Sequence, residues 1–201
     1  MSTPKINSDN FSECASQDRS QRLFFALWPD DTLRQQLVHR SRPLVQAAHG
    51  RPVPAENLHM TLAFLGNVNA RQRDCVERMA ETIACPSFDL ALNCFGHWSR
   101  SQVLWFAPRE TPEPLTRLVD VLAVGVRECG LSLDARPYRP HLTLARKVSS
   151  APENKFVEPI TWPVGHFVLV RSVPVPQGVA YEVVREWPLG EHSETTPSDV
   201  V

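Results

Sequence analysis

Apolar residues recur along the chain with two periods, and together they predict an α+β fold. Short apolar or alternating runs, typical of strands, lie at 23–28, 58–65, 88–95, 103–107, 164–170 and 179–187, with one more inside 138–147. Apolar positions three and four apart predict three helices, which begin near residues 31, 70 and 112. We expect the first helix to break or end at Pro43 and the third to end at Gly130.

The remaining segments are predicted to be irregular. Residues 131–140 lack a clear period, and 149–163 are interrupted by prolines, so both are expected to be loops. Residues 1–20 and 190–201 are polar and poor in large apolar groups, which predicts a disordered N-terminal tail and a polar C-terminal tail. A single domain at 21–189 is left between them.

Two of the predicted strands carry the same five-residue pattern. His-x-Thr-Leu-Ala begins at His59 and again at His141, 82 positions later. Because side chains alternate along a strand, each copy has its His and Thr on one face and its neighbouring Leu residues on the other. Similar orders of strands and helices surround the two copies, which indicates a weak internal duplication. We therefore expect two pseudo-symmetric lobes, each an antiparallel sheet with helices outside, facing each other across a central cleft.

Composition is that of an ordinary soluble domain. Of the 201 residues, 42% are hydrophobic and 21% charged, and no apolar run approaches the roughly 18 residues of a membrane span. The N-terminus has no apolar segment of the secretory type, so we expect a cytoplasmic protein. Five cysteines form no C-x-x-C pair, which predicts free buried thiols in a reducing compartment.

The cationic residues are unusual in kind rather than in number. Net charge is only −1, which argues against long-range attraction to duplex nucleic acid, yet 18 of the 21 cationic residues are Arg. The planar guanidinium matches phosphate oxygens in pairs. Several of these cations surround the second motif, namely Arg136, Arg139, Arg146 and Lys147.

Two imidazoles with two hydroxyls on facing strands suit a phosphodiester undergoing in-line displacement. Imidazole titrates near pH 6.5, so one His can be neutral and accept a proton from water while the other donates one to the leaving oxygen. The Thr hydroxyls can donate to phosphate oxygens, and Arg146 or Arg139 can neutralise their charge. The motifs lack Asp or Glu at ligand spacing, and no G-x-S-x-G elbow is present, so neither a metal nor a Ser nucleophile is expected.

With these residues the chain resembles a known family. The segments His59 to Leu62 and His141 to Leu144 look like the paired HxTx motifs of the 2H phosphoesterases. The flanking residues over about 20–188 resemble the bacterial RNA 2′,3′-cyclic phosphodiesterases, also called 2′-5′ RNA ligases. This resemblance implies the duplicated 2H fold and metal-independent hydrolysis of RNA 2′,3′-cyclic phosphate ends to 2′-phosphomonoesters, without a cofactor.

The resemblance also implies individual roles. His59 would be the proton donor, His141 the proton acceptor, and Thr61, Thr143 and Arg146 would bind phosphate. Arg146 lies five positions after His141, so a regular strand would send it to the opposite face unless the strand ends or bulges.

Further substrate contacts are possible at Arg139, Tyr138, Phe64 and Trp98; for Phe64, which takes the place of Arg146 in the first copy, we favour packing in the core. The partner is expected to be RNA or a nucleotide with a cyclic phosphate end, bound by a monomer. The alternatives are 2′-5′ RNA ligation at the same site and a non-catalytic module that binds RNA ends.

Overall fold

The computed structural model describes residues 20–150, 155–176 and 178–190. The predicted tails therefore lie outside the described residues except at Ser20 and Gly190, and the backbone of Gly190 still hydrogen-bonds to Cys85 and Ser87. The elements in chain order are β1 (Gln21–Leu27), α1 (Asp31–Ala47), β2 (Arg51–Pro52), η2 (Ala55–Asn57), β3 (Met60–Val68), α2 (Ala70–Glu81), β4 (Phe88–Trp98), β5 (Val103–Pro108), α3 (Glu113–Glu128), β6 (Leu142–Arg146), β7 (Lys155–Val164), β8 (His166–Val175) and β9 (Gly178–Pro188).

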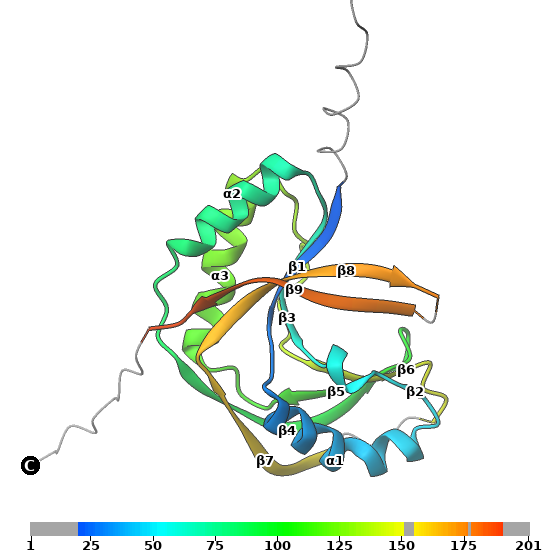
Figure 1. Cartoon of the computed structure of the whole chain (residues 1–201). Coiled ribbons are helices and arrows are strands. Elements are labelled where there is room, and N and C mark those ends of the chain that lie inside the picture. Colours follow the sequence, from blue (N-terminus) through cyan, green and yellow to red (C-terminus); the bar gives the residue numbers. More distant parts are fainter. Residues whose placement is uncertain (1–19, 151–154, 177, 191–201) are drawn as a thin grey trace, which may run out of the picture.

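All nine described strands belong to one antiparallel sheet, and its order makes two halves visible (Figure 1). The order is β7-β4-β5-β6-β3-β1-β8-β9, and β2 pairs separately with β6. The motif strands β3 and β6 form the inner edges of the two halves. Between them the ladder consists of one residue pair, Met60 with Leu142. The predicted α+β fold with duplicated antiparallel sheets is thus confirmed.

Each half combines elements from both ends of the chain, which a simple split of the sequence would not produce. The half that contains β3 is completed by the C-terminal hairpin β8–β9, and α2 and α3 lie on its side of the molecule (Figure 1). The other half is covered by α1, which contacts β6 and β7 although it follows β1 in the chain. The two lobes are therefore interleaved in sequence.

The predicted strands and helices are present, with two corrections. Pro43 does not end the first helix, since α1 continues to Ala47; a helix can accommodate an internal proline by losing one hydrogen bond and bending. The segment predicted as a loop at 149–163 contains β7 in its described part. Pro159 and Pro163 are tolerated there because β7 is the outermost strand of its half and pairs only with β4.

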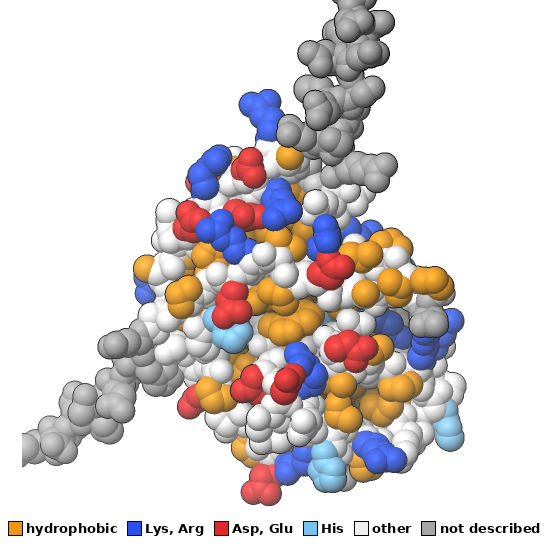
Figure 2. Space-filling view, viewed as in Figure 1, with side chains coloured by type: hydrophobic (Ala, Val, Ile, Leu, Met, Phe, Trp, Pro, Cys, Tyr) orange, Lys and Arg blue, Asp and Glu red, His pale blue; other side chains and the backbone are white. Residues whose placement is uncertain are grey.

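Charged and hydrophobic side chains both reach the surface on the face shown in Figure 2. Charged side chains gather over α2, where Arg185 from β9 forms ion pairs with Glu77 and Glu81. Hydrophobic side chains are exposed along the β8–β9 hairpin, including Val179 at 42% and Val183 at 44%. None of the described helices has the length and apolarity that crossing a membrane requires.

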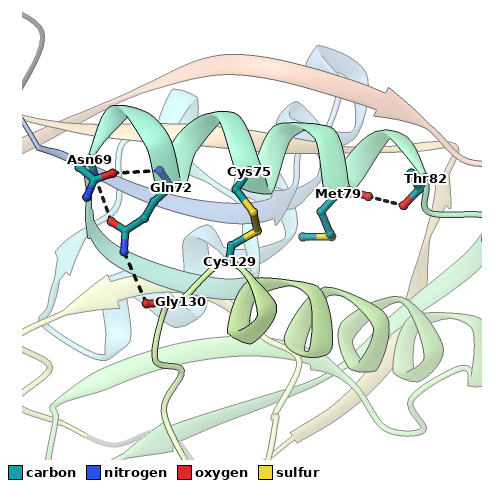
Figure 3. Close-up of a disulfide and its surroundings, with 7 residues drawn as sticks. All are labelled: Asn69, Gln72, Cys75, Met79, Thr82, Cys129 and Gly130. Atoms are coloured by element: carbon teal, nitrogen blue, oxygen red, sulfur yellow. Dashed lines mark hydrogen bonds between the residues drawn. A yellow bond between two sulfur atoms is a disulfide. The ribbon is translucent and has the colours of Figure 1, made fainter.

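A disulfide between Cys75 of α2 and Cys129 at the end of α3 corrects the prediction of free thiols (Figure 3). The two helices pack closely because Gly125 has no side chain where Met79 fills the space. Asn69 caps α2 and forms a capping box with Gln72, whose amide reaches the carbonyl of Gly130. Among the described cysteines, the prediction holds for Cys85, which is buried, and partly for Cys94, which is half-buried.

The disulfide should stabilise the half that contains β3. Because the cross-link spans 54 residues, its loss should lower the free energy of unfolding by about 2–4 kcal/mol, mainly by relaxing the unfolded chain. We expect this decrease in the double variant Cys75→Ala/Cys129→Ala, measured by urea unfolding, and a similar decrease when the natural sequence is reduced. Cys94→Ala is the matched control, and a midpoint that does not respond to reductant would contradict the prediction.

Candidate active site

His59 lies in the turn that leads from η2 into β3, and its ring is fixed by its own backbone neighbourhood. Nδ1 of His59 is 2.7 Å from the carbonyl oxygen of Asn57. A carbonyl can only accept, so Nδ1 carries the hydrogen and Nε2 is left for chemistry. The Asn57 side chain is itself held, because its amide donates to the carbonyl of Val179 at 3.0 Å. The first motif is thereby tied to the β8–β9 hairpin.

His141 repeats this arrangement in the second copy. Its Nδ1 is 2.7 Å from the carbonyl oxygen of Arg139, again two residues earlier in the chain. By the same reasoning Nδ1 donates, and Nε2 is the nitrogen available to a ligand. The duplication therefore preserves the tautomer as well as the residue types.

The single pair that joins the two half-sheets also brings the four motif residues together. Met60 and Leu142 pair directly and are both fully buried. Alternation then sends their neighbours to the opposite face, where His59, Thr61, His141 and Thr143 are all half-buried. Extension of the antiparallel register beyond this one pair sets His59 opposite Thr143 and makes the two histidines diagonal neighbours, and the charge of His141 acts on His59. The predicted convergence of the two copies is present in the structure.

A bulge in the second motif strand, β6, resolves the question of which face Arg146 occupies. Two consecutive residues of β5, Trp105 and Leu104, pair with Thr143 and Ala145 of β6. Leu144 is therefore the extra residue of the bulge. Leu144 and Ala145 are both buried, and the alternation is shifted by one, which turns Arg146 to the exposed motif face. Arg146 forms none of the ion pairs found among the described residues. Burial is the main cause that lowers the pKa of both histidines, and the guanidinium charge of Arg146 adds to it.

Aromatic rings surround His59 on several sides. Trp28 stacks on the imidazole at 5.6 Å, and Phe24 and Tyr181 lie 4.9 and 5.0 Å from it. The pKa of His59 is lowered to about 4, chiefly by burial among these rings; the hydrogen bond to Asn57 opposes this shift, and the positive charges of Arg146 and His141 add to it. His59 is therefore neutral at pH 7 in the free protein.

His141 has a more open environment. Trp98 approaches its ring edge-on at 4.5 Å. Burial lowers the pKa of His141, and the charge of Arg146 adds to this, while the hydrogen bond to Arg139 opposes it. The two histidines therefore differ in their surroundings although their backbone contacts are alike.

A match to a family model accompanies this geometry. Residues 29–174 match the model of the 2′-5′ RNA ligase superfamily, which covers both motifs. The chain belongs to this superfamily.

Curated and solved members of the superfamily extend over most of the chain. It is 40% identical over 131 residues to the RNA 2′,3′-cyclic phosphodiesterase of Escherichia coli, covering 65% of this chain and 74% of that one. It is 33% identical over 187 residues to the enzyme of the same name from Thermus thermophilus, covering 85% and 92%. The crystal structure of E. coli LigT in apo form superposes with a TM-score of 0.78 at 34% identity, over 86% of this chain and 99% of that one.

The other candidate contacts from the sequence have different positions. The hydroxyl of Tyr138 donates to the carbonyl of Thr61 at 3.2 Å, so it ties the approach to β6 to the first motif strand; burial raises the pKa of Tyr138. Trp98 lies beside His141, and Arg139 is exposed next to it. Phe64 is 45% exposed, which shows that our preference for a core position was wrong.

Three residues that contact His59, namely Trp28, Asn57 and Tyr181, were not predicted from the sequence as parts of the site. Trp28 directly follows the first strand and Asn57 lies two residues before His59, so their positions in the sequence could have indicated that they lie near the site. Tyr181 had no such local signal, because its contact depends on the pairing of β8 and β9 with β1. Within the described residues, His, Cys, Asp and Glu side chains form no group of three or more that could hold a metal ion.

The stacked indole should control the ionisation of His59. Trp28→Ala admits water to the imidazole and should raise its pKa from about 4 towards the ordinary 6.5, measured by NMR titration of the ring protons. Trp98→Ala is the matched control, because it should raise the pKa of His141 and leave that of His59 almost unchanged. An unchanged or lower pKa of His59 in Trp28→Ala would show that the indole does not desolvate it.

Proposed function

We propose that the chain hydrolyses RNA 2′,3′-cyclic phosphate ends to 2′-phosphomonoesters by metal-independent acid–base catalysis with two histidines. The enzyme class, RNA 2′,3′-cyclic phosphodiesterase, is that of the curated relatives, as the motifs predicted. The observation that carries the mechanism is the pair of His-x-Thr units on one face around Met60 and Leu142, with Arg146 turned to the same face. We further infer a cytoplasmic monomer that acts without a cofactor.

The geometry assigns one step to each side chain. Water attacks phosphorus and loses a proton to Nε2 of His141, while the bond from phosphorus to the 3′ oxygen breaks and that oxygen takes a proton from Nε2 of His59. Hydroxyls of Thr61 and Thr143 donate to the phosphoryl oxygens, and Arg146 neutralises their charge. Each histidine then exchanges its proton with solvent, which restores the starting state.

The donor role of His59 requires the substrate's charge. With a pKa of about 4, His59 is almost fully neutral at pH 7 in the free protein. A bound phosphodiester is an anion, which favours the charged imidazolium and raises the pKa of a nearby histidine. We therefore propose that His59 becomes protonated as the cyclic phosphate binds.

Ligation of 2′ and 5′ ends is the second candidate, favoured by the description of the superfamily. It is the reverse transesterification, in which a 5′ hydroxyl replaces water at the same site. A non-catalytic module that binds RNA ends is less well supported, because holding a phosphate requires donors and charge but not two imidazoles with their Nε2 atoms free. Product analysis on a cyclic-ended oligonucleotide separates the three, since hydrolysis leaves a 2′-phosphate, ligation leaves a longer chain, and binding alone leaves the end intact.

Both histidines should be needed for turnover in excess EDTA. His59→Ala and His141→Ala should each lower kcat on a nucleoside 2′,3′-cyclic phosphate by about 10²–10⁴-fold, the usual contribution of a proton donor or acceptor. An activated aryl phosphodiester, whose leaving group needs no proton, should depend strongly on His141 and only weakly on His59. The exposed His39 of α1 provides the control variant, His39→Ala. Full activity of either motif variant on the cyclic substrate would remove the proposal, and the reverse ranking on the aryl ester would exchange the two roles.

The pH dependence of kcat/KM should be bell-shaped with its maximum on the acidic side. The reactive free enzyme carries one proton on the histidine pair, and both pKa values lie below the ordinary 6.5, that of His59 at about 4. Activity should therefore fall as pH drops through about 4, where the second proton binds, and fall again as pH rises towards 6.5, where the first is lost. A rate that is constant between about pH 5 and about pH 9 would contradict the two-histidine scheme.

A further inference from the structure

A row of paired residues crosses the sheet at the level of Arg146 and ends on a second arginine. Trp98 of β4 pairs with Val103 of β5, which pairs with Arg146 of β6. Arg146 pairs in turn with Arg51 of β2. Residues that pair directly in adjacent strands have their side chains on the same side of a sheet. Trp98 contacts the ring of His141, so this side carries the histidines. Arg51 therefore lies on the motif face, beside Arg146.

Gly50 allows β2 to lie this close to β6. A methyl group added at Gly50 would lie 2.8 Å from a side-chain carbon of Val148 and 3.2 Å from the carbonyl oxygen of Arg146. The first distance is shorter than packed carbon atoms adopt. The absence of a side chain at this position thus lets the two-residue strand β2 pair with β6. The pairing sets two guanidinium groups opposite each other, although like charges directly opposite in a ladder are destabilising.

The side chain of Arg51 extends towards the β8–β9 hairpin. A methyl group added at Gly178, the first residue of β9, would lie 4.0 Å from a terminal guanidinium nitrogen of Arg51. The next residue, Val179, accepts the hydrogen bond from Asn57, whose own carbonyl holds the ring of His59. Figure 2 shows cationic side chains gathered near the end of this hairpin. The guanidinium of Arg51 therefore lies where the hairpin meets the segment that leads to His59.

The register places Arg51 on the side of His59 within the site. β5 occupies one edge of β6, so β2 and β3 share the other edge. Along that edge Met60 pairs with Leu142, and the pair of Arg51 with Arg146 follows towards the end of β6. His59 directly precedes Met60 and so lies between that residue and β2. The second cation thus continues the line of the proposed proton donor.

A cyclic-ended RNA carries its next anion on the corresponding side of the ribose. Under the proposed mechanism His59 protonates the 3′ oxygen, which is attached to C3′. The neighbour of C3′ is C4′, and C4′ carries the 5′ arm with the phosphate that joins the preceding nucleotide. The neighbour of C2′ is C1′, which carries the base. The internucleotide phosphate therefore extends from the side of the ribose that faces His59, towards Arg51.

We propose that Arg51 binds the internucleotide phosphate on the 5′ side of the terminal nucleotide, while Arg146 holds the cyclic phosphate. This inference rests on the proposed function and adds a second phosphate site to it. A guanidinium can donate to two oxygens of one phosphate, and an anion at this position also offsets the repulsion between the paired arginines. The site thereby favours the end of an RNA chain over a free cyclic mononucleotide.

The test removes one negative charge from the substrate and leaves the rest of it in place. The dinucleotide ApA with a 2′,3′-cyclic phosphate end is compared with its analogue whose internucleotide linkage is an uncharged methylphosphonate. The natural sequence should have a KM about 10-fold to about 100-fold lower for the charged dinucleotide, the range that a hydrogen bond to a charged group corresponds to. Arg51→Ala should raise the KM of the charged dinucleotide by that factor, with kcat unchanged, and should leave the KM of the neutral analogue unchanged.

Arg71 supplies a matched control, because it is an exposed arginine on α2, far from β2 (Figure 1). Arg71→Ala should leave the KM values of both dinucleotides unchanged. Salt provides a second readout, since each phosphate contact on a single strand contributes about 0.7 to the slope of log affinity against log salt concentration. On the charged dinucleotide, Arg51→Ala should therefore have a slope smaller by about 0.7 than that of the natural sequence.

Three results would overturn the inference. One is an equal KM of Arg51→Ala and the natural sequence on the charged dinucleotide. Another is an equal loss by Arg51→Ala on both dinucleotides and on adenosine 2′,3′-cyclic phosphate, because Arg51 would then act on the cyclic phosphate or on the fold. The third needs no variant and applies even if Arg51→Ala does not fold: equal KM values of the natural sequence for the charged and the neutral dinucleotide.

Failure of the proposed function is distinguishable from failure of this inference. If the natural sequence hydrolyses no cyclic phosphate, binding of ApA with a 3′-phosphate end can be followed by tryptophan fluorescence, since Trp28 and Trp98 flank the histidines. Weaker binding of this dinucleotide by Arg51→Ala, with unchanged binding of its methylphosphonate analogue, would then support the second phosphate site alone. Equal binding of the charged dinucleotide by the two proteins would overturn it.

Discussion

The structure depends on one antiparallel contact, the pair of Met60 and Leu142. Among the described residues it is the only backbone pair that joins the two halves of the sheet, and both side chains are fully buried. Burial of two such side chains contributes about 1.5–3 kcal/mol each, which fixes the register of the inner strands. Because alternation is strict near this pair, stabilising one face of the sheet also places both imidazoles and both hydroxyls on the other. Core packing and the arrangement of the candidate site are therefore consequences of the same contact.

Other contacts reinforce this pair. The hydroxyl of Tyr138 donates to the carbonyl of Thr61. The backbone of Val53, between β2 and η2, donates to the carbonyl of Leu144. Each connects a residue near one motif to the backbone of the other. A strand pair with one ladder position would otherwise be free to slip, and a slip of one residue would turn the histidines into the core.

The sequence predicted what local alternation determines and failed where distant partners decide. The motif strands, α2 and α3 follow from periods in the chain, and even the bulge was recognisable as a condition for Arg146. The same condition applies to Phe64: β3 has a bulge at Leu62, which makes Leu62 and Ala63 two consecutive buried residues and leaves Phe64 exposed. Position at the sheet edge makes β7 possible despite its prolines, and no local pattern reports which strand will be outermost. The disulfide and the packing of Tyr181 on His59 likewise join segments far apart in the sequence.

The two motif copies hold their histidines by the same backbone contact, but the side chains around the two imidazoles differ. Each Nδ1 is held by the carbonyl two residues earlier, so both rings present Nε2. His59, however, is enclosed by three aromatic rings, and His141 is approached by the edge of one. The energetic cost of charging a buried imidazole falls when an anion binds beside it, so the enclosed histidine gains its proton in the bound state rather than before. Under the proposed mechanism, burial of His59 thus makes the supply of the proton for the leaving oxygen conditional on a phosphate being in place.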